Sequence, residues 1–301
     1  MDLSVIIVSY NVKELLKNCL ESILKYTQNL KYEIIVVDNA STDNSVSYLR
    51  SLSNLKLILS KENGGFSKGN NLGIKEAKGK YILLLNPDTL LVENSLKIIF
   101  DWMEARPKIA VASCQLLNSE QKITPTGGYF PNLSRLIMWA FFIDHFIPIK
   151  SYHSHASFWP QSRISKNAGD AGAAQHDTEL DWITGAFFMI RKETLDRVGL
   201  LDENIFMYGE ELEWCLRFKQ NGFKVGYAPV TKIIHLAKSL PRNAVLGEFK
   251  GLKYIYEKHF FGWRQTVLEF LLNIAAVLRI IMWLVRLKPV MAKIYLEALF
   301  L

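Results

Sequence analysis

The first 115 residues alternate short apolar runs with helix-like segments, and this alternation restricts the possible folds more than any other feature. The apolar runs have the length and β-branched content of buried strands. They cover residues 3–9, 32–37, 55–59, 81–85 and 109–113. Segments with helical spacing separate them, at residues 12–26, 43–49, 66–77 and 94–104. Strands separated by helices predict βαβ units and therefore an α/β fold with a mostly parallel sheet.

The pattern changes after residue 115. Residues 133–149 are rich in Trp, Phe and Ile, and residues 151–181 are polar, which predicts a long loop. Ordered elements resume at residues 182–190, followed by a helix at 209–220 and two strands at 224–227 and 231–235. From residue 244 onward the sequence predicts helices only.

Composition limits the class of protein and its partners. The chain has 301 residues, half of them hydrophobic, which is enough for one large domain or two small ones. Its net charge of +7 favours anionic partners such as nucleotides, nucleic acid or an acidic membrane surface. Three widely spaced cysteines fit a reducing compartment, and the N-terminus lacks the pattern of a signal peptide. We therefore expect the catalytic part in the cytosol.

Two predicted strands end in carboxylates. Asp88 follows the strand at 81–85 through Asn86 and Pro87, and Asp38 ends the strand at 32–37. Ligands of open α/β sheets bind at the carboxyl ends of the strands, where Asp88 would suit a divalent cation held jointly by phosphates. Asp38 could accept hydrogen bonds from a nucleobase or a ribose. The alternative for both is a turn or a helix cap.

Three further groups of residues could bind a ligand or take part in catalysis. Gly64 and Gly65 precede a helix and could let backbone N–H groups approach an anion, although a glycine-rich turn is the default explanation. Glu210 and Glu211 stand in the first turn of a predicted helix, where acids are stabilising in any case. Because neighbours point about 100° apart, one of them could face a cleft as a general base. His235 becomes a metal ligand only if it lies beside Asp88.

Six segments, in this order, resemble the family 2 glycosyltransferases of the GT-A fold, and most of all a rhamnosyltransferase-like branch of bacterial polysaccharide synthesis. The segments are SVIIVSYN (4–11), VDNASTD (37–43), NGGF with GNN (63–71), LNPD (85–88), WITGA (182–186) and DENIFMYGEE (202–211). The resemblance covers residues 3–240 and implies a GT-A domain at 1–240. Within it, residues 1–115 would be the nucleotide-binding half, 116–181 a variable segment and 182–240 the acceptor half, followed by helices at 241–301.

The resemblance also implies roles for individual residues. Asp38 would hold the base or ribose of the nucleotide, and Asp88 with His235 would bind Mg²⁺ or Mn²⁺ near the diphosphate. Glu211, with Glu210 beside it, falls where the family's Glu-Asp pair has its catalytic aspartate, and it would act as the general base. The remaining residues expected to contact the nucleotide sugar are Tyr10, Asn11, Asn39, Gly65, Asn70, Asn86, Gly185 and Ala186.

The implied activity is inverting transfer of a sugar, rhamnose being one candidate, from a nucleotide-diphosphate donor. The acceptor would be a hydroxyl of a polyprenyl-linked or other glycan in cell-surface polysaccharide synthesis. Asn86 stands where the family's metal-binding element has its first Asp, and Glu211 where the family has an Asp. These departures keep open a nucleotide-sugar- or glycan-binding protein without full activity. A sugar nucleotidyltransferase would need a glycine-rich basic loop after the first strand, where this chain has Ser9-Tyr10-Asn11.

The C-terminal residues 267–287 are apolar enough to span a bilayer. They nevertheless contain Glu269, Asn273, Arg279 and Arg286, and an Arg at the centre of a spanning helix costs about 2.5–3.5 kcal/mol. Basic residues on both sides favour a helix lying in an anionic membrane surface, peripheral or monotopic on the cytoplasmic face. A spanning helix and a packing helix are the alternatives. Because the basic residues cluster near this apolar stretch, nucleic acid is not an expected partner.

Overall fold

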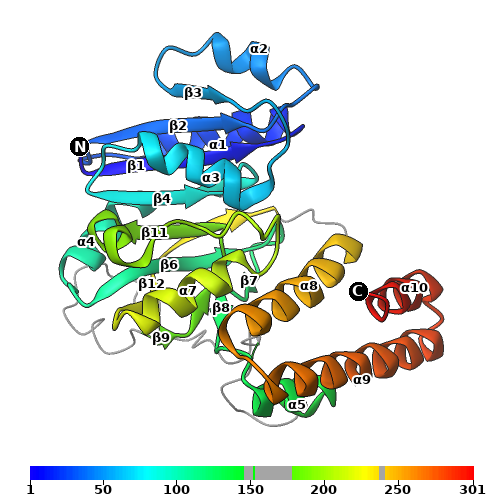
Figure 1. Cartoon of the computed structure of the whole chain (residues 1–301). Helices are drawn as coiled ribbons and strands as arrows, with labels where there is room; N and C mark the ends of the chain where they lie inside the picture. Colours follow the sequence, from blue (N-terminus) through cyan, green and yellow to red (C-terminus); the bar gives the residue numbers. More distant parts are fainter. Residues whose placement is uncertain (146–151, 153–177, 237–240) are drawn as a thin grey trace.

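A computed structural model describes residues 1–145, 152, 178–236 and 241–301. Most of the predicted polar loop at 151–181 lies outside these residues. The main sheet has the strand order β3–β2–β1–β4–β11–β6–β12–β5 (Figure 1). These strands are β1 (Leu3–Ser9), β2 (Tyr32–Asp38), β3 (Lys56–Leu59), β4 (Tyr81–Leu85), β5 (Thr89–Leu91), β6 (Ile109–Leu117), β11 (Phe187–Arg191) and β12 (Lys224–His235).

The sheet is mostly parallel, as the sequence predicts. Strands β3, β2, β1 and β4 are parallel to one another, and β12 is parallel to β6. Strand β11 enters antiparallel between β4 and β6, with Phe187 opposite Leu85. Consequently β11 begins at the same edge of the sheet at which β4 ends. Short strands complete the set: β7 (Ile123–Thr124), β8 (Gly127–Gly128), β9 (Thr178–Leu180) and β10 (Trp182–Ile183).

Helices cover both faces of this sheet, because alternate residues of each buried strand point to opposite sides. On β4, Leu83 and Leu85 pack in a core with α1 and α4, whereas Ile82 and Leu84 pack in a second core with α3 and α7. The helices of the sheet domain are α1 (Lys13–Tyr26), α2 (Ser45–Arg50), α3 (Gly65–Glu76), α4 (Ser95–Glu104), α6 (Leu195–Val198) and α7 (Glu210–Gln220), with a 3₁₀ turn at Lys192–Thr194. A second 3₁₀ turn, at Ile143–His145, packs on α5 (Leu133–Ala140).

A third core belongs to a helical platform made of four helices (Figure 1). They are α5 (Leu133–Ala140), α8 (Pro241–His259), α9 (Trp263–Val285) and α10 (Pro289–Ala298). Helix α9 packs on α5, α8 and α10, and its Leu268, Leu272 and Ala276 are buried there. Among the residues described, α9 is the one helix long and apolar enough to cross a bilayer, by length and composition.

Arg279 lies on the inner face of α9 and not on its outer face. Its guanidinium donates to the carbonyl of Trp139 at 3.0 Å and stacks 4.1 Å from the centre of the Trp139 ring. The outer face of α9 is apolar, with Phe270, Val277 and Ile281 all exposed. Helix α9 therefore has apolar residues on its exposed side as well as on its buried side, unlike an ordinary amphipathic surface helix.

Two details differ from the sequence prediction. The two strands predicted at 224–227 and 231–235 form one strand, β12, whose pairing with β6 is irregular between Ala228 and Lys232. Pro229 in this interval cannot donate to the ladder, and a bulge absorbs it without ending the strand. The three-residue strand β5 was not predicted, because it follows the turn after Asp88 too closely to show a pattern.

Candidate active site

The first part of the candidate site lies where β1 and β2 end. Ser9 and Asp38 are opposite each other in the parallel ladder, and both are buried. Asp38 Oδ1 accepts a hydrogen bond from the Ser41 amide at 2.8 Å, whereas Asp38 Oδ2 and Ser9 Oγ are buried without a partner among the described residues. Buried polar atoms without partners are costly, and they mark a place where a ligand can supply the missing hydrogen bonds.

The loops that follow these two strands are tied together. The Asn11 amide donates to Ser41 Oγ at 3.0 Å, and Asn11 Oδ1 accepts from the Thr42 amide at 2.7 Å. Asn11 holds a left-handed backbone with φ of 53°, which asparagine tolerates better than most residues. The neighbouring Tyr10 is 46% exposed and therefore accessible at the end of β1.

The glycine-rich turn before α3 serves close packing. Gly65 has φ of +76°, and a Cβ atom at this position would lie 2.6 Å from Phe206 Cδ2. The Gly65 amide donates to Asn63 Oδ1 and the Phe66 amide to the Phe206 carbonyl at 2.8 Å, so both groups already have acceptors. Asn39 Nδ2 donates to the Gly65 carbonyl at 2.9 Å, while Asn39 Oδ1 is buried without a described partner.

Asp88 and His235 meet, as the metal-site prediction requires. His235 Nε2 lies 3.3 Å from Asp88 Oδ1, and the Leu236 amide donates to the Asp88 carbonyl at 2.9 Å. This contact arises because β12 pairs with β5 immediately after Asp88, with His235 opposite Thr89. One carboxylate and one imidazole suit a divalent cation whose other ligands come from phosphate and water. No cluster of three or more His, Cys, Asp or Glu side chains suited to a metal occurs in the described parts of the chain.

Gly185 and Ala186 join the end of β4 to the start of α3. The Asn86 amide donates to the Ala186 carbonyl at 3.1 Å. A Cβ atom at Gly185 would lie 2.8 Å from the Phe66 ring, so glycine is needed for this approach. Asn70, one turn along α3, is buried and donates to the Phe66 carbonyl at 2.9 Å. Asn70 therefore supports the turn from inside the helix.

Two adjacent acids begin α7. Tyr208 and Gly209 precede them in left-handed conformations, with φ of 70° and 99°. Glu210 is 4% exposed and Glu211 is partly buried, and one oxygen of each is buried without a described partner. Burial, and next the charge of Glu211, raise the pKa of Glu210 well above its usual range, while burial also raises the pKa of Glu211. Such a pair favours one protonated and one ionised carboxyl group.

Close contacts connect the groups at the carboxyl edge of the sheet. The connected residues are Asp38, Asn39, Gly65, Phe66, Gly185, Ala186, Asn86, Asp88 and His235. Phe206, which packs on Gly65, precedes Glu210 and Glu211 in the chain. Ser9 and Phe206 are the additions that sequence reasoning missed. Ser9 stands inside the SVIIVSYN segment at a strand end, and that position is the signal by which it could have been found.

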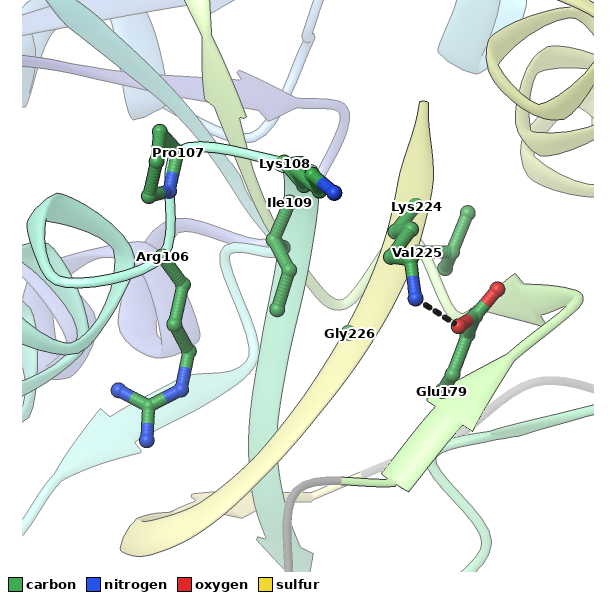
Figure 2. Close-up of a pocket in the computed structure, with 8 residues that line it drawn as sticks. All are labelled: Arg106, Pro107, Lys108, Ile109, Glu179, Lys224, Val225 and Gly226. Carbon is green, nitrogen blue, oxygen red and sulfur yellow. Dashed lines mark hydrogen bonds and ion pairs between the residues drawn. The ribbon is translucent and has the colours of Figure 1, made fainter. Parts of the chain in front are cut away.

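A pocket of about 430 Å³ lies elsewhere, at the amino ends of β6 and β12 (Figure 2). Ile109 and Lys224, the first residues of these strands, line it, and Lys224 is paired with Glu179 at 2.9 Å. None of the predicted site residues contributes to its lining. The pocket is therefore separate from the edge that carries the carboxylates.

The architecture is that of a glycosyltransferase with the GT-A fold. The mannosyltransferase PcManGT from Pyrobaculum calidifontis, solved with GDP-Man and Mn²⁺, matches 98% of this chain and 85% of its own chain, with a TM-score of 0.59 and 17% identity. GalNAc-T7, solved with UDP, GalNAc and Mn²⁺, also has a TM-score of 0.59 and 17% identity. The match covers 85% of this chain but 48% of the longer GalNAc-T7 chain.

Sequence comparison identifies the family. Residues 4–167 match the model of glycosyl transferase family 2, and the chain belongs to this family. It is 27% identical to the rhamnosyltransferase WbbL of Escherichia coli K12, over 77% of this chain and 83% of WbbL. It is 22% identical to the N-acetylglucosaminyl-diphospho-decaprenol L-rhamnosyltransferase of Mycobacterium tuberculosis, over 88% of this chain and 87% of that enzyme. The chain is thus a rhamnosyltransferase-like glycosyltransferase.

Proposed function

We propose that this glycosyltransferase moves a sugar, with inversion, from a nucleotide-diphosphate donor to a hydroxyl of a lipid-linked glycan. The observation that carries the proposal is a set of buried oxygens without a partner among the described residues, on Asp38 and Asn39 at the end of β2 and on Glu210 and Glu211 at the start of α7. These atoms need hydrogen-bond donors, and a nucleotide sugar and an acceptor hydroxyl would supply them. The similarity to the two rhamnosyltransferases supports rhamnose as the sugar and a polyprenyl-linked glycan as the acceptor.

The donor half of the proposed site consists of Asp38 and the Asp88–His235 pair. Asp38 Oδ2 would accept a hydrogen bond from the base or the ribose. Asp88 and His235 would hold Mg²⁺ or Mn²⁺. Both solved structures compared above contain Mn²⁺. When bound, the cation would supply a positive charge that stabilises the leaving diphosphate. Asn86, as a neutral amide beside this pair, adds no further negative charge.

The acceptor half consists of the two acids of α7. Glu211 would accept the proton of the attacking hydroxyl, and Glu210 would keep its own proton because burial and the charge of Glu211 raise its pKa. One carboxyl group thus acts as the base, while its neighbour donates a hydrogen bond to it. This assignment also explains why a second acid directly precedes the base.

The outer face of the helical platform supports a location at a membrane surface. Exposed apolar side chains follow α9 and α10, with basic residues beside them; they are Trp263, Phe270, Val277, Ile281, Leu284, Val290, Arg264, Arg286, Lys288 and Lys293. A helix that buries its central Arg279 in the protein and exposes apolar residues with basic residues near its ends suits a position in the interface of an anionic bilayer. We propose that the platform lies on the cytoplasmic face of the membrane, where a polyprenyl-linked acceptor is also found.

The test is sugar transfer by purified protein with a panel of nucleotide-diphosphate rhamnose and hexose donors, with and without Mn²⁺. Glu211→Gln and Asp88→Ala should each lower turnover by at least a hundredfold, since each removes one chemical function. Glu21→Gln, at an exposed position of α1, is the matched control and should retain activity. Near wild-type turnover in both site variants would refute the scheme. Donor binding without transfer by the unmodified protein would favour the binding-protein alternative.

A further inference from the structure

We propose that helix α8 positions the carboxyl groups of Glu210 and Glu211, and that Gly247 and Gly251 of this helix are the positioning residues. The inference rests on the proposed function in one respect, the role given to Glu210 and Glu211. Its structural basis is independent of that role. It lies in the contacts that α8 makes before, at and after the turn that carries the two acids.

The closest contact is between α8 and the turn itself. A Cβ atom at Gly251 would lie 2.6 Å from the Tyr208 carbonyl oxygen and 3.2 Å from Gly209 Cα. A Cβ atom at Gly247, one helical turn earlier, would lie 2.9 Å from Tyr208 Cβ and closer still to its ring. The helix therefore presents a face without side chains to the two left-handed residues before Glu210. Any side chain there must displace the backbone or the ring of the turn.

A second contact fixes the segment that precedes the turn. Lys258 Nζ donates to Asp202 Oδ2 at 2.6 Å, and the Tyr254 hydroxyl donates to the same oxygen at 2.7 Å. The Tyr254 hydroxyl also accepts from Asn204 Nδ2 at 3.2 Å. These groups lie one and two turns beyond Gly251 on α8. The helix thus holds both ends of the segment from Asp202 to Gly209.

A third contact fixes the first turn of α7. Glu213 is fully buried and receives hydrogen bonds from Arg217 of its own helix and from Lys258 at 2.8 Å, while His259 Nε2 lies 3.0 Å away. The Glu213 amide in turn donates to the Gly209 carbonyl at 2.9 Å. A buried carboxylate with several cationic partners is strongly constrained in position. The last residues of α8 therefore set the orientation of the helix that begins with Glu210.

The opposite side of the same segment is held by α3. Ser67 Oγ donates to the Ile205 carbonyl at 2.8 Å, and the Phe66 amide donates to the Phe206 carbonyl. The segment that leads to the acids is thus confined between the donor side of the sheet and the helical platform. A shift of α8 would therefore act directly on the Tyr208–Gly209 turn, since α8 contacts this turn and the residues before it are held by α3.

The experiment compares Gly251→Ala and Gly247→Ala with Lys250→Ala, an exposed control on the same helix. Gly251→Ala should lower kcat at least tenfold with little change in the donor KM, and should shift the acid limb of the pH profile, because the two carboxyl groups change their mutual geometry. Tyr208→Gly should rescue Gly247→Ala, which meets the Tyr208 side chain, but not Gly251→Ala, which meets the Tyr208 carbonyl. A folded Gly251→Ala protein with wild-type kcat and pH profile would overturn the proposal.

A readout independent of sugar transfer separates this proposal from the proposed function. Hydrogen exchange of the amides in residues 208–213 should be faster in Gly251→Ala than in the wild type and in Lys250→Ala, because the hydrogen bond from Glu213 to Gly209 is strained. If no donor is turned over but exchange changes as stated, the function proposal fails and the positioning role stands. If transfer occurs and exchange in Gly251→Ala is unchanged, the positioning role fails. If Gly251→Ala does not fold, the same measurements are made on Gly247→Ala with and without Tyr208→Gly. Failure of Tyr208→Gly to restore the wild-type values would then overturn the positioning role.

Discussion

At the scale of single residues, the pKa values of Glu210 and Glu211 make the proposed reaction depend on pH. In the proposed mechanism Glu211 is the general base and must be ionised, and burial raises its pKa above that of an ordinary glutamate, about 4.3. We therefore expect kcat/KM to fall as the pH is lowered through a value clearly above 4.3, earlier than for an exposed base. Rate profiles over a range from about pH 4 to pH 9 measure this limb.

The partner acid supplies a matched pair of variants for the same measurement. A hydrogen bond from Glu210 lowers the pKa of Glu211. Glu210→Gln keeps a hydrogen-bond donor and should leave the acid limb close to its original place. Glu210→Ala removes the donor and should move the limb to higher pH. Identical limbs in the two variants would contradict the paired arrangement.

At the scale of elements, the contact between α5 and α9 depends on one buried arginine. Replacing Arg279 by Met retains much of its volume but leaves the carbonyls of Trp139 and Ala140 without their donor. The expected loss in the free energy of unfolding is about 1–3 kcal/mol, measured by urea denaturation. Arg286→Met, at an exposed position of the same region, should change it by less than about 0.5 kcal/mol. Equal effects of both substitutions would show that the inward orientation of Arg279 contributes nothing.

The sequence predicted the elements that have a strong local pattern and missed those set by distant partners. The apolar runs of β1, β2 and β4 are buried on both faces and can be recognised without tertiary information. The antiparallel direction of β11 could not be predicted, because Phe187–Arg191 is an apolar run like that of a parallel strand. Its direction follows from its neighbours β4 and β6.

The same distinction holds for the candidate site. Asp38 and Asp88 could be chosen as candidates because strand ends are visible in the sequence. The use of Gly65 in close packing could not be predicted, since its close contact is with Phe206, far along the chain. The inward position of Arg279 could not be predicted either. Helical spacing places Arg279 on one half of α9, but it does not reveal that α5 covers that half.

At the scale of the whole molecule, the exposed apolar face of the platform predicts binding to lipid. The protein should sediment with vesicles that contain anionic lipid, and less so as salt increases from about 0.1 M to 1 M. The double variant Phe270→Asp/Ile281→Asp should bind at least tenfold more weakly, because two exposed apolar side chains no longer enter the interface. Its melting temperature should stay the same.

The control for this prediction is Leu24→Asp, since Leu24 is an exposed apolar residue of α1, outside the platform. It should leave vesicle binding unchanged. Equal sedimentation of the wild type and the double variant would contradict the proposal that the platform binds the membrane. It would not affect the proposal that the donor binds at the carboxyl edge of the sheet.

The three cysteines, Cys19, Cys114 and Cys215, are all free and buried. Burial raises the pKa of Cys19 to about 12, and the pKa values of Cys114 and Cys215 rise as well, so almost no thiolate is present in the folded chain. Alkylating reagents can therefore reach these sulfurs only when a segment opens. Cys19 contacts the Asn86 carbonyl, Cys114 lies in the middle of β6 and Cys215 lies in α7. The order in which the three thiols are modified would therefore show which part of the enzyme undergoes local unfolding first.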